Sequence, residues 1–234
     1  DVFQVRRFLL HFLPPELVNT ILDDAEYWPR IRSTRDRILI ADASPNNNHN
    51  ASLRCLLAPA FPTSAALGGP SARLRVELVQ FDLVSNDQGW GGNPQDEGTY
   101  NGSYTWFEAA ILRPRTAPKP HGWRRWAAML GSHRFSPTRP LFEVTDAAGR
   151  SRWLIQTNRC ATRETMHHTI IWQTCGPDGG LVEPRSGEEL GNGDGAGFVE
   201  LLAPEDRIGI VARAKFPGWV NCVHSASVVV YYAV

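Results

Sequence analysis

The 234-residue chain has no excess of charge of one sign, because 24 lysines and arginines balance 24 aspartates and glutamates. A chain without net charge exerts no general attraction on polyanions, so the composition disfavours nucleic acid as a partner. No run approaches the roughly 18 apolar residues of a membrane-spanning helix, so no membrane span is predicted. A Gly-x-Ser-x-Gly nucleophile elbow is absent, as are HExxH and Cys-x2-Cys metal motifs. We therefore predict no catalytic residue, no metal and no cofactor.

Cysteine is scarce, and no two cysteines lie close together in the sequence. The four are Cys55, Cys160, Cys175 and Cys222. Three lie in or beside apolar runs, where a free buried thiol is the ordinary interpretation. We therefore expect a reduced, cytoplasmic protein. A signal peptide that had been cleaved would leave no trace, and the sequons at Asn50 and Asn101 would fit secretion, although such triplets also arise by chance.

Short β-type segments dominate the chain from Arg73 onward. In residues 206–214 Ile208 and Ile210 share one face opposite Arg207 and Arg213, which is the two-residue period of a strand. The predicted strands are 37–42, 74–85, 103–113, 126–130, 141–145, 152–159, 167–175, 197–203, 206–214 and 224–233. Glycine- and proline-rich connections separate them, with no helical pattern between. This arrangement predicts an all-β fold, an antiparallel β-sandwich or jelly roll.

The first 32 residues are predicted to be helical and to pack on the sandwich, which then occupies residues 33–234. Pro14 and Pro15 precede a helical stripe that includes Leu17, Ile21 and Trp28. An amphipathic helix of this kind usually faces a core. Residues 43–73 lose all periodicity, and we predict a mobile surface insertion there.

Two resemblances accompany these patterns. The segment 12–22, with its Leu-Pro pair, Glu-Leu and Ile-Leu, resembles the start of an F-box, whose helices bind an adaptor of a ubiquitin ligase. Residues 85–234 resemble a jelly-roll-like β-sandwich domain of filamentous-fungal proteins that mostly lack an assigned activity. The motifs that carry this second resemblance are Asp87-Gln88-Gly89-Trp90, Thr105-Trp106-Phe107, His168 with Trp172, and residues 206–221. It implies a fold but no catalytic residues.

Two tryptophan-bearing loops are the best candidates for a binding site. Trp90 follows one predicted strand and Trp219 follows another, so both could lie at one end of the sandwich. Flat aromatic faces beside a few placed polar groups are typical of sugar and peptide sites. The alternative is that each tryptophan plugs the end of the sandwich, with its N–H bonded to a carbonyl. The candidate ligand-binding residues are Asp87, Gln88, Trp90, Trp106, Arg213, Trp219 and Asn221.

Charge is segregated locally, although the total is zero. The stretch 113–139 is basic and contains no acid, whereas the stretch 178–206 is acidic. We expect these stretches to pair with one another, within the molecule or across a homodimer.

Five side chains are of types that bind metals, namely His167, His168, Cys175, Cys222 and His224. Buried core cysteines and histidines within strands explain them better than a metal site does.

These observations predict a non-catalytic binding module, most simply for a protein partner, that uses the end loops. A lectin-like domain that binds a glycan through Trp90, Asp87 and Asn221 is the first alternative. A hydrolase is the second, with Glu77, Asp82 and Glu108 as the carboxylates of a concave sheet face.

Overall fold

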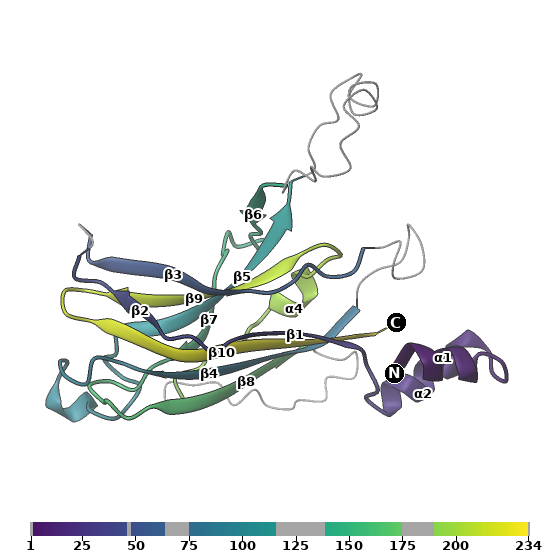
Figure 1. The fold of residues 1–234 in the computed structure, drawn as a ribbon, viewed down its shortest axis with the longest axis horizontal. Coiled ribbons are helices and arrows are strands. Elements are labelled where there is room, and N and C mark those ends of the chain that lie inside the picture. Colours follow the sequence, from purple (N-terminus) through teal and green to yellow (C-terminus); the bar gives the residue numbers. More distant parts are fainter. Residues whose placement is uncertain (1, 46–47, 64–74, 116–138, 175–189, 234) are drawn as a thin grey trace, which may run out of the picture.

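The structure, a computed structural model, describes residues 2–45, 48–63, 75–115, 139–174 and 190–233. Two antiparallel five-stranded sheets are stacked on one another (Figure 1). The first has the order β1-β10-β4-β8, with β2 also paired to β10, and the second has the order β3-β9-β5-β6, with β7 also paired to β5. The predicted fold class, an antiparallel β-sandwich, is confirmed.

The strands of the first sheet are β1 (Arg30–Arg35), β2 (Leu39–Asp42), β4 (Arg75–Asn86), β8 (Met166–Gln173) and β10 (Val220–Ala233). Those of the second are β3 (Asn50–Leu57), β5 (Thr105–Pro114), β6 (Leu141–Glu143), β7 (Trp153–Thr157) and β9 (Arg207–Lys215). The helical elements are α1 (Val2–Leu9), α2 (Pro15–Asp24), a 3-10 turn η1 (Pro94–Asp96) and α4 (Phe198–Leu201). The predicted strand 126–130 lies outside the described residues.

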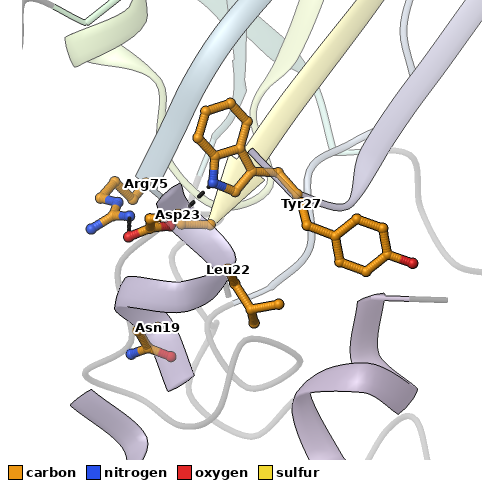
Figure 2. A pocket seen from close by; sticks show the side chains of 7 residues that line it. Asn19, Leu22, Asp23, Tyr27 and Arg75 are labelled. Atoms are coloured by element: carbon orange, nitrogen blue, oxygen red, sulfur yellow. Dashed lines mark hydrogen bonds and ion pairs between the residues drawn. The ribbon is translucent and has the colours of Figure 1, made fainter. Parts of the chain in front are cut away.

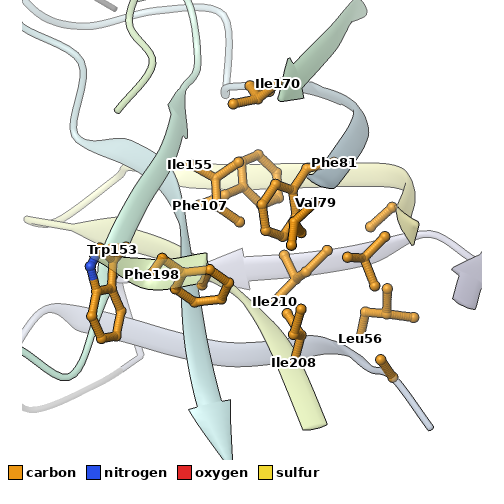
Figure 3. Close-up of a cluster of buried hydrophobic side chains, with 14 of the residues drawn as sticks. Leu56, Val79, Phe81, Phe107, Trp153, Ile155, Ile170, Phe198, Ile208 and Ile210 are labelled. Carbon is orange, nitrogen blue, oxygen red and sulfur yellow. The ribbon is translucent and has the colours of Figure 1, made fainter. Parts of the chain in front are cut away.

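The core lies between the two sheets and is rich in aromatic side chains (Figure 3). Phe81 of the first sheet contacts Trp172 edge-on, with ring centroids 4.7 Å apart. Phe198 of α4 lies 5.2 Å from Trp153 of the second sheet and 5.0 Å from Trp172. Burial of such rings is the main stabilising contribution to a sandwich of this size.

Residues 197–203 were predicted to be a strand, and this prediction is wrong for the helical turn α4. Phe198 and Val199 are both buried, and the N–H of Leu202 donates to the carbonyl of Val199 at 3.2 Å, which is a bond within a tight helical turn and not a bond between strands. Gly197, with φ of 76°, turns the chain into the helix. The turn thereby places Phe198 between the sheets.

Two other predictions from the sequence need correction. Residues 30–32 were assigned to the helical segment, but they belong to β1, which pairs with β10 from Arg30 opposite Tyr231 to Arg35 opposite Ala226. Residues 50–57, assigned to the insertion at 43–73, form β3 along β9. A bulge between Arg54 and Leu56 shifts the alternation of β3, which is why its sequence shows no period.

The helical pair α1–α2 lies beyond one end of the sandwich (Figure 1). Val18 and Leu22 of α2 are buried, but Leu17 and Ile21 are 52% and 44% exposed. Only part of the predicted apolar stripe of α2 is therefore buried, and the rest is open to solvent. Among the described residues, no helix has both the length and the apolar character needed to cross a membrane.

A small cavity of about 180 Å³ separates α2 from the adjoining strand ends (Figure 2). Asp23 accepts a hydrogen bond from the Trp28 indole at 3.1 Å and forms an ion pair with Arg75 at 2.5 Å. The backbone N–H of Tyr232 donates to the carbonyl of Pro29 at 3.2 Å. These polar contacts help to attach the helical pair to β4 and β10.

Candidate functional site

Four loops meet at the end of the sandwich that is far from the helices. The β9–β10 turn is bonded to the β2–β3 connection, because Phe216 N–H donates to the carbonyl of His49 at 2.8 Å and Gly218 N–H donates to Ser44 Oγ at 3.1 Å. The β4–β5 loop is bonded to the β7–β8 loop by paired backbone hydrogen bonds, Gly98 N–H to Cys160 O and Cys160 N–H to Thr99 O. Backbone and side-chain hydrogen bonds therefore join the loops at this end of the sandwich.

Asp87 holds the first tryptophan loop in place. Its side chain is fully buried, and its carboxylate accepts backbone hydrogen bonds from Gly89 at 2.7 Å, Ala161 at 2.6 Å and Thr162 at 3.0 Å. Burial raises the pKa of the Asp87 carboxyl, and the three N–H donors offset that rise only in part. Asp87 therefore ties two loops together and offers no free oxygen to a ligand.

Gln88 and Asn221 have the same structural role. The Gln88 amide donates to the carbonyl of Trp90 at 2.5 Å and accepts from the N–H of Val220 at 3.0 Å, which joins the two tryptophan loops. Asn221 is fully buried, and its amide donates to the carbonyls of Trp106 at 3.0 Å and Arg213 at 3.3 Å. The predicted polar partners of a ligand are therefore engaged within the protein.

The two tryptophans differ in exposure. Trp219 is 7% exposed and plugs the end of the sandwich, whereas Trp90 is 57% exposed. The Trp90 ring lies against Gly218, where an added Cβ would approach it to 2.7 Å. Gly218 also has φ of 85°, so its lack of a side chain serves both the turn and this close packing.

Two exposed aromatic residues that we did not predict flank Trp219. Tyr104 and Phe216 are each 41% exposed and meet edge-on at 4.6 Å, and the Tyr104 ring is 5.2 Å from that of Trp219. We call Trp90, Tyr104 and Phe216 the aromatic end patch. A Phe before Pro-Gly and a Tyr at the start of a predicted strand were visible in the sequence, but no pattern indicated that the fold joins them.

Trp106 and Arg213 lie beside this end, on the outer face of the second sheet. The Arg213 guanidinium lies over the Trp106 ring at 5.4 Å, donates to Glu108 at 3.2 Å and donates to Asn50 at 3.0 Å. The Trp106 indole also donates to Glu108 at 2.8 Å. The seven predicted site residues therefore gather at one end, but the residues that remain open there are mainly aromatic.

Of the three carboxylates considered for hydrolysis, Glu77 forms an ion pair with Arg75, and the other two lie on opposite faces of the sandwich. Asp82 lies on the outer face of the first sheet, where it accepts from Gln80, Thr169 and Ser227. Glu108 lies on the outer face of the second sheet. The whole core separates the two groups, so they cannot act on opposite sides of one bond.

The basic and acidic stretches pair with one another at two points among the described residues. Arg113 donates two hydrogen bonds of 2.8 Å to Asp206, which is fully buried, and Arg139 lies 3.6 Å from Glu205. Residues 116–138 of the basic stretch and 178–189 of the acidic stretch lie outside the described residues. Pairing inside the chain was one of the two arrangements that the sequence left open.

The candidate metal ligands are dispersed. His167 points outward from β8 and His168 points inward, while Cys175 lies outside the described residues. Over the ranges that the structure describes, no three His, Cys, Asp or Glu side chains gather as a metal site would need. Cys55, Cys160 and Cys222 carry free thiols, and burial raises the pKa of Cys55 to about 12.

Comparison with known proteins identifies no family for the chain. No family model matches it, and no curated protein matches it. A solved structure of peanut lectin with a nine-residue peptide is similar over 88% of this chain and 99% of the lectin chain, at 10% identity and a TM-score of 0.30. The fold assignment accordingly rests on the strand pairing described above.

Proposed function

We propose that this chain is a non-catalytic binding module that recognises a protein partner through the aromatic end patch. The observation that carries the proposal is the exposure of Trp90, Tyr104 and Phe216 at the end where hydrogen bonds to Asp87 and Gln88 fix the two tryptophan loops. Aromatic side chains contribute a large share of the energy at protein interfaces. A rigid platform also loses little conformational entropy when a partner binds.

The lectin-like alternative has weaker support. A sugar site needs polar groups that are free to bond hydroxyls beside an aromatic face. Asp87, Gln88 and Asn221 were the candidates for this role, and each is satisfied by groups of the protein itself. The aromatic part of the predicted site is therefore available, while its polar part is not.

Selection from a displayed peptide library, run in parallel with a glycan array, tests the proposal. We expect the wild-type chain to enrich related peptides and to leave the array unlabelled. The double variant Trp90→Ala, Phe216→Ala should weaken binding of the enriched peptides at least about tenfold, since each truncation removes a hot-spot ring. Glycan labelling that depends on Trp90 would instead support the lectin.

A matched control separates loss of the patch from general damage. Tyr27 is 40% exposed and belongs to the helical end of the molecule, so Tyr27→Ala removes a comparable ring far from the patch. Peptide binding that Tyr27→Ala weakens as strongly as the patch variant would argue against the proposed site. Thermal melts of all variants verify that the sandwich is folded.

A second candidate function concerns the F-box-like segment 12–22. Its support is the exposure of Phe12, Leu17 and Ile21, at 71%, 52% and 44%, which leaves an apolar surface beside the buried Val18 and Leu22. The double variant Leu17→Asp, Ile21→Asp alters only exposed positions. Calorimetry with a purified ubiquitin-ligase adaptor tests the idea, and heat of binding that this variant retains would reject it.

A further inference from the structure

The two sheets differ in how their margins are protected against further strand pairing. Exposed strand edges present unpaired N–H and C=O groups, and proteins usually blunt them with charges, bulges or short length. In the first sheet, β1 carries three arginines in six residues, at Arg30, Arg32 and Arg35, and β2 has only four residues. These features protect one margin of that sheet.

The margins of the second sheet are protected as well. β3 carries a bulge between Arg54 and Leu56, and β6 has only three residues. The outer edge of β7 is already bonded, because Thr157 N–H donates to Gly191 O at 2.7 Å and Gly193 N–H donates to Ile155 O at 3.2 Å. Strand addition is discouraged at each of these positions.

β8 lacks all of these protections. It is eight residues long, contains no Pro, Gly, Lys, Arg, Asp or Glu, and pairs with β4 from Leu78–Gln173 to Ser85–Met166 without a register shift. Within the part of the chain that the structure describes, its other side is the end of the sheet order. Ile171 in its middle is 52% exposed. β8 is therefore a regular, uncharged edge.

The hydrogen-bond pattern shows which groups face the free side of β8. The N–H of Thr174 donates to the carbonyl of Glu77, which makes this a hydrogen-bonded pair of the β4–β8 ladder. Hydrogen-bonded pairs alternate with non-bonded pairs along an antiparallel ladder. Residues 168, 170 and 172 consequently bond to β4, and the N–H and C=O groups of residues 167, 169, 171 and 173 point away from it.

We propose that two copies of this chain pair through β8, antiparallel about a two-fold axis near the middle of the strand, so that their first sheets become one continuous sheet. A second copy fits this edge because an uncharged strand meets no like-charge repulsion from itself across the axis. The zero net charge of the chain also removes the general repulsion between copies. The aromatic end patch is not part of this contact, so it would be presented twice in the dimer.

Light scattering coupled to size exclusion tests the pairing. The wild-type chain should have roughly double its 26.0 kDa mass at micromolar concentration. Ile171→Pro removes an N–H of the free edge without removing a bond to β4, and Ile171→Lys places a charge on that edge. Each should raise the dimer dissociation constant about tenfold or more.

Ile40→Lys is the matched control, because Ile40 is a 56% exposed isoleucine on β2 of the same sheet. The Ile40→Lys protein should remain dimeric. Amide exchange gives an independent readout: the N–H groups of residues 169 and 171 should exchange more slowly in the wild type than in Ile171→Lys. If Ile171→Pro does not fold, Ile171→Lys decides the result. A monomeric wild type, or a dimer that Ile171→Lys leaves unchanged, would overturn the proposal.

Discussion

His168 is expected to make the fold less stable at mildly acidic pH. The side chain is 9% exposed and points from β8 toward the interior, where its Nε2 lies 3.0 Å from the Tyr100 hydroxyl. Its Nδ1 has no hydrogen-bond partner among the described residues. Burial, with added repulsion from Arg159 and His167, lowers the pKa of His168 from 6.5 to about 4.

The direction of the effect follows from proton linkage. The pKa is lower in the folded state, so between about pH 6.5 and pH 4 the unfolded chain binds a proton that the folded chain does not. Stability is therefore complete above this window and falls as the pH is lowered through it. A shift of this size corresponds to a loss of about 3 kcal/mol in total, of which about 2 kcal/mol should appear between about pH 7.5 and pH 5.

Urea unfolding followed by tryptophan fluorescence at several pH values measures this loss. His168→Gln is the comparison, because its amide can accept the Tyr100 hydroxyl but does not titrate. Other titrating groups contribute equally to both proteins, so the difference between the two curves isolates His168. Free energies of unfolding that run parallel from neutral pH to about pH 5 would refute the assignment of a buried, neutral imidazole.

Paired substitutions give two further predictions, both measured by urea or thermal unfolding. Arg113→Ala leaves the buried Asp206 without its bidentate partner and should lower the free energy of unfolding by about 3 kcal/mol. Arg139→Ala breaks an exposed ion pair and should lower it by less than about 1 kcal/mol. Equal losses in the two variants would contradict this prediction. Gly92→Ala and Gly98→Ala both place alanine at φ near 75°, but only at Gly92 would the new Cβ meet a buried sulfur, at 2.8 Å. Gly92→Ala should therefore be the more destabilising by about 1 kcal/mol or more, and the reverse order would show that the loop packs differently.

Strand patterns with regular alternation were predictable. In β9 the residues Ile208 and Ile210 are buried, and in β8 the residues His168 and Trp172 are buried, as their two-residue period indicated. Their positions could be found because each side chain's environment repeats locally along the strand. The positions of the two tryptophan loops at strand ends followed from the same reasoning.

Elements that depend on a distant partner were not predictable. β1 pairs with β10, nearly 200 positions further along the chain, and its sequence Arg-Ile-Arg-Ser-Thr-Arg carries no core signal. β3 is defined by its ladder with β9 and is interrupted by a bulge. Burial of Phe198 between two tryptophans, and not local preference, places α4 between the sheets.

The candidate site divides along the same line. Its residue types, a pair of Gly-Trp loops with neighbouring polar groups, could be read from the sequence, and so could the class of fold that carries them. Which of those groups face solvent was decided by tertiary structure alone, because Asp87 and Asn221 are buried by contacts with strands and loops far away in the chain. The same packing buries Trp219, leaves Trp90 open and brings Tyr104 against Phe216 and Trp219, since a side chain's exposure depends on everything that folds around it.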